Sequence, residues 1–149
     1  MFGELYHNRV LELAADIAHE GRLEAPDGIG EKTSRLCGST MRVEVCLDGD
    51  VITAIAVEPR ACALGQAVAG ILTQSAIGAT VDEIRQGRDG LAAMLKEGAP
   101  PPEGRFWELR HLQPVKDFPP RHGSTLLAFE AALAAIEDAR ARHRPGLGA

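Results

Sequence analysis

The sequence predicts an α+β fold, in which a small antiparallel sheet packs against several helices. Residues 41–47 alternate between apolar and polar side chains, and residues 51–59 repeat this period after an Asp-Gly-Asp turn, which is typical of a β-hairpin. Helical patterns precede and follow this hairpin instead of alternating with strands, which argues against βαβ units. The 149 residues suffice for one domain with a substantial core. We expect a single domain over residues 1–142 and a flexible tail over residues 143–149.

The elements up to the hairpin follow from spacing. Apolar residues at helical spacing predict a first helix, and residues 21–35, with three glycines and a proline, predict an irregular connection. Pro59 ends the second hairpin strand or marks an edge. Because two strands alone are marginally stable, we expect residues 33–37 to supply part of a third strand and helices to cover one face. The residues that predict the first helix are Tyr6, Val10, Leu13 and Ile17.

The rest of the chain predicts further helices. Residues 62–77 are small and aliphatic, which indicates a buried helix closed by Gly78 in the left-handed conformation. Thr-Val-Asp-Glu at 80–83 is a capping box that opens a short helix ending at Gly87, and residues 89–98 predict another short helix. Residues 106–123 are expected to be mostly irregular or briefly helical. A final helix with Ser124 or Thr125 as N-cap is predicted by the apolar stripe Leu126, Leu127, Phe129, Leu133 and Ile136.

Composition argues against several functional classes. The formal net charge of -5 and the scarcity of aromatic residues argue against a nucleic-acid or anionic membrane surface as partner. No apolar run approaches the ~20 residues that span a bilayer, and the first twenty residues lack the pattern of a signal peptide, so we expect a cytoplasmic protein. Three cysteines, an odd number, argue against a disulfide framework. No phosphate-binding loop or Ser-His-Asp pattern appears, so we do not expect an enzyme.

Reactive side chains stand at three element boundaries. Cys37 precedes the hairpin, Cys62 follows it at the start of the buried helix, and His122 precedes the final helix. Boundary residues of this kind can converge on a metal or nucleophile site, and a helix N-terminus favours the thiolate form of Cys62. The residues alone leave open that both cysteines are inert core residues. We interpret Cys46, on the charged face of the first hairpin strand, as incidental.

Longer stretches resemble the iron–sulfur cluster scaffold family (IscU, SufU and the N-terminal domain of NifU). The likeness runs from about Tyr6 to the last helix. "CGSTMRVEVCLDGDVITAIAVEPRACALGQA" resembles that family's Cys-Gly-Asp, hairpin and second cysteine without a gap, and "VKDFPPRHGSTLLAFEAAL" resembles the SufU-type segment that carries its third cysteine. The resemblance implies a scaffold that holds zinc or assembles an iron–sulfur cluster, with a cysteine desulfurase and iron–sulfur acceptor proteins as partners.

Position by position, the resemblance assigns a partial ligand set. Cys37 matches the first cysteine and Cys62 the second, whereas Ser39 replaces the aspartate and Ser124 the third cysteine. Arg121 matches the basic residue ahead of that third cysteine, and Gly123 occupies a position that is histidine in IscU-type members. Because a serine hydroxyl is a poor ligand for zinc or iron near neutral pH, we expect Cys37, Cys62 and His122 as the ligands.

Three functions follow as hypotheses. In the first, Cys37 and Cys62 accept sulfur and, with His122, bind iron or zinc during cluster assembly, while Arg121 stabilises negative charge. In the second, the protein is a metal-binding or interaction module that has lost assembly. In the third, it is a thiol enzyme with Cys62 as nucleophile and His122 as base, for which the sequence offers no third, orienting group.

Overall fold

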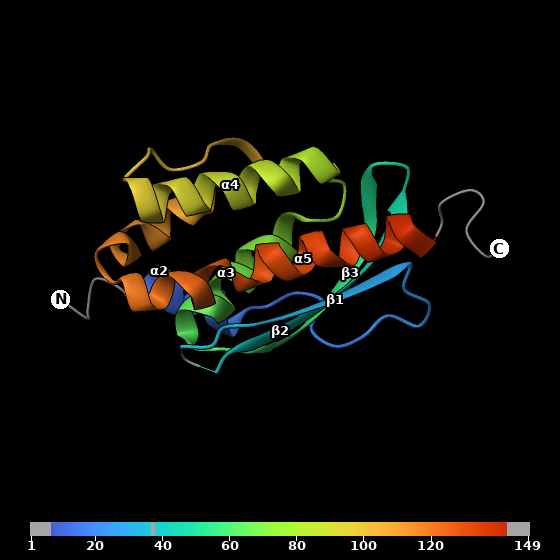
Figure 1. Ribbon diagram of the computed structural model, residues 1–149, viewed down its shortest axis with the longest axis horizontal. Coiled ribbons are helices and arrows are strands. Elements are labelled where there is room, and N and C mark those ends of the chain that lie inside the picture. Colours follow the sequence, from blue (N-terminus) through green and yellow to red (C-terminus); the bar gives the residue numbers. More distant parts are fainter. Residues whose placement is uncertain (1–6, 37, 143–149) are drawn as a thin grey trace.

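A computed structural model of the protein describes residues 7–36 and 38–142 and confirms the α+β fold (Figure 1). Three antiparallel strands form one sheet in the order β1-β2-β3. The strands are β1 (Gly28–Thr33), β2 (Thr40–Asp48) and β3 (Val51–Arg60). The hairpin of β2 and β3 is as predicted, and Gly49 in its turn has a φ of 63°, where glycine is favoured.

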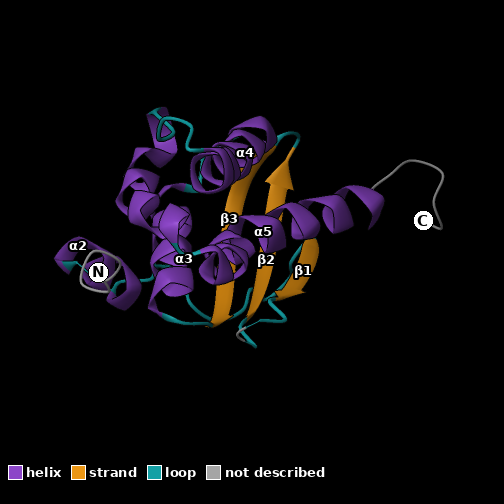
Figure 2. Cartoon of the chain, turned by 60° about the vertical axis from the view of Figure 1, so that its left-hand side comes forward, coloured by secondary structure: helices purple, strands orange, loops and turns teal. Residues whose placement is uncertain are grey.

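Helices cover one face of this sheet, as Figure 2 shows. α5 contacts β1 and β2, α3 contacts β3, α2 packs on α3, and α4 packs on α5. No helix in the described part of the chain combines the length and apolar composition needed to cross a membrane. The helices are α2 (Asn8–Ala15), α3 (Ala63–Ser75), α4 (Val81–Glu97) and α5 (His122–Arg142), joined by the 3-10 segments η1 (Gly104–Asp117) and η2 (Pro119–Arg121).

The predicted third strand is present, but its predicted bounds of 33–37 are wrong, because it is β1 at 28–33 and so occupies part of the connection expected to be irregular over 21–35. Glycines at alternate positions of β1 hide the apolar period that marks a strand. A Cβ on Gly28 would lie 2.1 Å from the carbonyl oxygen of Ala135, and one on Gly30 would lie 2.4 Å from that of Ala131. The backbone of α5 therefore rests directly on the backbone of β1, and only glycine fits between them.

The prediction of two short helices over 80–98 is also wrong, since α4 is continuous. It begins at the predicted capping box, in which the Thr80 hydroxyl accepts from the Glu83 N–H, and ends at Gly98 with a φ of 69°. Gly87 lies inside the helix and packs against the Phe129 ring. A Cβ at position 87 would stand 2.7 Å from an atom of that ring. This glycine serves close packing and does not terminate the helix.

The ends of the other helices differ in detail from the prediction. α2 ends before Ile17, and Tyr6 lies outside the described residues, as does the predicted tail over 143–149. α5 begins directly after η2 at His122, so neither Ser124 nor Thr125 is its N-cap. α3 ends at Ser75 with Ala76 as its C-cap, so Gly78 has the expected positive φ, 91°, but does not close the helix as predicted.

Candidate functional site

Three separate segments of the chain meet at one end of the sheet. Thr33, Thr40 and Arg60 lie in register across β1, β2 and β3, so the 34–39 connection and the entry to α3 leave the sheet at the same end. The start of α5 joins them, because a Cβ on Gly123 would stand 3.2 Å from the Ser34 hydroxyl. The topology thus gathers the three boundaries that the sequence singled out.

Cys62 faces α5 from the start of α3. It is the N-cap residue of that helix, with extended backbone dihedrals, and its side chain makes no capping hydrogen bond. Its Sγ instead lies 3.6 Å from the Ser124 Oγ, within hydrogen-bonding distance for sulfur. Gly65, one turn further, permits this approach, since a Cβ there would stand 3.0 Å from the Ser124 carbonyl oxygen. The half-buried thiol is therefore directed at the position where the resemblance expects a third cysteine.

Ser124 is held in place by its own helix. It is fully buried, and its hydroxyl lies 3.2 Å from the Arg121 carbonyl oxygen, to which it donates. The neighbouring Thr125 hydroxyl donates to the same oxygen at 2.7 Å. Both hydroxyls thus bond the carbonyl of the residue that directly precedes α5, which is how hydroxyl residues are tolerated inside a helix.

Backbone hydrogen bonds bring Ser34 close to both Gly38 and Ser39. The Ser34 N–H donates to the Ser39 carbonyl at 2.8 Å, and the Gly38 N–H donates to the Ser34 carbonyl at 2.9 Å. Gly38 has a φ of 68°, and both serines are buried. Cys37 itself lies outside the described residues, so its position in the site stays a prediction.

His122 is oriented by the backbone of η1. Its Nε2 lies 3.0 Å from the Val115 carbonyl oxygen and 3.3 Å from that of Lys116. Because carbonyl oxygens only accept, Nε2 is the donor in these contacts, and in the neutral form of the ring the lone pair is then on Nδ1. A backbone carbonyl on one imidazole nitrogen is the usual partner of a histidine that binds a metal through the other.

Two consequences follow for the predicted ligands. Within residues 7–36 and 38–142, no group of three His, Cys, Asp or Glu side chains is placed to hold a metal ion. Since Cys37 is not among these residues, the set Cys37, Cys62 and His122 is untested and stays a prediction. The hydrogen-bonding neighbour of the Cys62 thiol in the described part of the chain is Ser124 and not His122, so the nucleophile–base pair of a thiol enzyme gains no support.

Sequence reasoning missed the glycines that build the site. Gly65 and Gly123 carry no chemistry, yet each stands where a side chain would separate two of the three segments. Cys46, by contrast, lies near the other end of β2, where its thiol donates to the Ala25 carbonyl at 3.4 Å. This position agrees with the interpretation of Cys46 as incidental.

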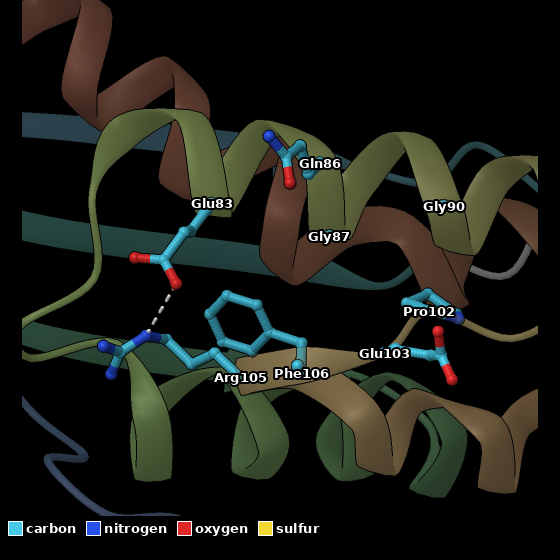
Figure 3. A pocket seen from close by; sticks show the side chains of 9 residues that line it. Glu83, Gln86, Gly87, Gly90, Pro102, Glu103, Arg105 and Phe106 are labelled. Atoms are coloured by element: carbon cyan, nitrogen blue, oxygen red, sulfur yellow. Dashed lines mark hydrogen bonds and ion pairs between the residues drawn. The ribbon is translucent and has the colours of Figure 1, made fainter.

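A cavity of about 290 Å³ lies elsewhere, between α4 and the segment that leads into η1 (Figure 3). Its polar side chains include Glu83 and Arg105, which are 3.2 Å apart. The guanidinium of Arg105 also donates to the carbonyls of Ser75 and Gly78, so it ties the end of α3 to the start of α4. Glu83 accepts from the Thr80 backbone N–H in the capping box. Glu83 and Arg105 therefore stabilise the fold through these hydrogen bonds. Cys62 and His122 do not line this cavity.

Glu83 makes the stability of this corner dependent on pH. The hydrogen bond from the Thr80 backbone N–H, and then the Arg105 side chain, hold the pKa of Glu83 below its ordinary value of 4.5. A lowered folded-state pKa contributes stability above the unfolded value, and this contribution is lost as the pH falls through the folded value. We therefore expect Glu83→Gln to lower the free energy of unfolding by about 0.5 kcal/mol at neutral pH, since this pair is partly exposed, and by less at pH values below 4.5.

Urea unfolding of both proteins at neutral and acidic pH measures this difference. Glu97→Gln, at the other end of α4, is the matched control and should not lower the free energy of unfolding at either pH. An equal loss for Glu83→Gln at both pH values would show that its carboxylate charge contributes nothing.

Comparisons with known proteins identify the family. The profile of the NifU-like N terminal domain matches residues 5–103. The chain is 27% identical over 126 residues to "Iron-sulfur cluster assembly scaffold protein IscU" of Streptococcus pyogenes serotype M1, an alignment that covers 84% of this chain and 79% of that protein.

Solved structures agree with this match. A nitrogen-fixing NifU-like protein (N-terminal) from Brucella abortus superposes with a TM-score of 0.91 at 42% identity, over 93% of this chain and 96% of that one. A putative iron-sulfur cluster assembly scaffold protein for the SUF system from Fervidobacterium islandicum AW-1 has a TM-score of 0.81 at 22% identity, over 90% and 98%, and shows the shared fold. Because the profile spans most of the chain and the Brucella abortus protein aligns almost end to end, this chain belongs to the NifU-like N-terminal domain family.

Proposed function

We propose that the protein is a scaffold of iron–sulfur cluster assembly, with Cys37 and Cys62 as sulfur acceptors. Family membership supports the process, and the meeting of three chain segments around the Cys62 thiol is the observation that carries the site. Iron or zinc would be bound by Cys37, Cys62 and the Nδ1 atom of His122. A cysteine desulfurase and iron–sulfur acceptor proteins of the cytoplasm would be the partners.

Sulfur acceptance is a thiol–persulfide exchange. The Cys62 thiolate attacks the outer sulfur of a persulfide on the donor cysteine, a new S–S bond forms, and the old one breaks. The donor cysteine leaves as a thiolate, and Cys62 now carries the persulfide, with no external oxidant or reductant consumed. Cys62 stands at the N-terminus of α3, and the positively charged Arg121 lies three residues before Ser124, the neighbour of the thiol.

The proposed ligands suit a site that binds iron or a cluster transiently and passes it on, more than one that holds it permanently. Ser39 and Ser124 replace two ligands of the family, and hydroxyls seldom ligate zinc or iron. Two thiolates and one imidazole leave a coordination position open, as in metal sites that exchange a ligand. The cargo bound here would therefore need an additional ligand from sulfide, solvent or a partner.

Anaerobic reconstitution with ferrous iron and sulfide tests the proposal. The wild type should develop a visible absorption band from sulfide-bridged iron, and Cys62→Ala should lose it. Cys46→Ala is the matched control, because it also removes one thiol, but at the end of β2 away from the site. This variant should keep the absorption band. A colourless wild type, or equal loss in both variants, would contradict the proposal.

A second function is a metal-binding or interaction module of this fold without cluster assembly. One observation favours it: the Ser124 hydroxyl already donates to the Arg121 carbonyl, so the third-cysteine position is integrated into α5 as a structural residue. Metal analysis after purification separates the two functions. Near-stoichiometric zinc without transfer of sulfur to Cys37 or Cys62 would favour the module, whereas persulfide on either cysteine, detected by mass spectrometry, would exclude it.

A further inference from the structure

The arginines of this protein divide into two groups. Of the twelve in the described part of the chain, eight form ion pairs with carboxylates, and Arg110 lies over the Trp107 ring. The remaining three, Arg35, Arg60 and Arg121, form no ion pair with any described residue. Within the described residues their charge is therefore uncompensated, in a chain whose formal net charge is -5.

All three uncompensated arginines border the candidate site, and together we call them the basic rim. Arg35 lies in the 34–39 loop directly after Ser34. Arg60 ends β3 opposite Thr40, two residues before Cys62. Arg121 ends η2 and lies three residues before Ser124, the neighbour of the Cys62 thiol. Arginines elsewhere in the described chain are neutralised or stacked, and those at this end of the sheet remain available.

The acidic residues near the rim do not neutralise it. Arg60 lines a shallow groove of about 190 Å³ together with Glu31 and Glu58. Glu58 is already paired with Arg22 at 2.8 Å and with Arg42 at 3.5 Å. Glu31 is exposed and forms no ion pair with a described residue. It is the one carboxylate of this groove without an ion pair among the described residues, and of the rim arginines it shares the groove with Arg60.

The arrangement fits a protein segment better than a small anion. Arg60 ends a strand, Arg121 ends a 3-10 turn and Arg35 lies between two strands, so the rim is spread over three segments of the chain, as are the contacts of an extended partner. Leu36, next to Arg35, is 78% exposed, the largest exposed fraction among the large apolar side chains of the described residues. An exposed apolar side chain beside arginines is typical of a protein–protein contact.

We propose that the basic rim binds an acidic segment of a partner protein, with Leu36 as an apolar contact beside Arg35. That this partner exchanges sulfur or iron at Cys62 rests on the proposed function, whereas the binding itself does not. Exposed charges of this kind act mainly on the association rate and are screened by salt. The rim therefore guides an acidic partner to the thiol although the protein as a whole is acidic.

Fluorescence anisotropy with a labelled oligoglutamate peptide that contains one leucine tests this inference. We expect salt-sensitive binding to the wild type and about tenfold weaker binding to the triple variant Arg35→Gln, Arg60→Gln, Arg121→Gln. The matched control is a second triple variant that changes the net charge equally, but at arginines that form ion pairs: Arg85→Gln, Arg88→Gln, Arg142→Gln. This control should bind like the wild type.

The proposal would be overturned if both triple variants bound the peptide equally weakly, or if the rim variant bound it as tightly as the wild type does. It would also be overturned if the wild type bound an oligothymidylate of equal charge more tightly than the peptide. Circular dichroism of each variant checks that it is folded. The reconstitution experiment uses only ferrous iron and sulfide and needs no partner. Its failure therefore contradicts the scaffold function, and failure of peptide binding contradicts the basic rim, independently of each other.

Discussion

Replacing Ser124 with cysteine is expected to raise the affinity of the protein for zinc by about a hundredfold, or nearly 3 kcal/mol. Two thiolates on one tetrahedral zinc, each with a Zn–S bond of about 2.3 Å, lie ~3.8 Å apart. The Cys62 Sγ and Ser124 Oγ are 3.6 Å apart, so a thiol at position 124 needs little adjustment to share a metal with Cys62. Competition against a chromophoric chelator measures the change in affinity.

Two further variants make this expectation specific. Ser75→Cys adds a thiol at the end of α3, remote from Cys62 along that helix, and should leave zinc affinity unchanged. Cys62→Ala combined with Ser124→Cys should lose the gain, because it exchanges one thiol for another and returns the number of thiolate ligands to that of the wild type. If the single variant binds zinc as weakly as the wild type, or the double variant as tightly as the single one, positions 62 and 124 do not form a shared ligand pair.

Much of the site is predictable from the sequence, because it follows from where elements begin. Cys62 stands at the start of a helix made of small residues, and the family resemblance points to position 124 as its neighbour. The orientation of His122 is not predictable, since it depends on carbonyls of η1 that became acceptors only when residues 104–117 formed 3-10 turns. Patterns of side chains carry no signal for such backbone acceptors.

The fold shows the same division between pattern and packing. The hairpin of β2 and β3 was predicted because its apolar residues alternate, and the capping box at Thr80 was predicted from four letters. β1 and the continuity of α4 were missed at glycines, whose local preference for turns is overridden by close packing. Gly28, Gly30 and Gly87 are set by what α5 places above them, which is a property of the tertiary structure.

Gly30→Ala is accordingly expected to lower the free energy of unfolding by about 3 kcal/mol, at the upper end of the range for overpacked cores. The new Cβ would stand 2.4 Å from both the Ala131 carbonyl oxygen and the Ala135 backbone nitrogen. Because both atoms belong to the backbone of α5, no change of side-chain rotamer relieves the clash, and the helix must move off β1. Urea unfolding followed by circular dichroism measures the loss.

Two comparisons separate this backbone contact from a general sensitivity of the strand. Glu31→Ala changes the next residue of β1, which is exposed, and should alter stability by no more than about 0.5 kcal/mol. Ala131→Gly combined with Gly30→Ala should not restore stability, because trimming a side chain leaves the opposing carbonyl in place. A tolerated Gly30→Ala, or rescue by Ala131→Gly, would mean that α5 and β1 are held apart by side chains. The glycines of β1 would then reflect local turn preference, as their sequence first indicates.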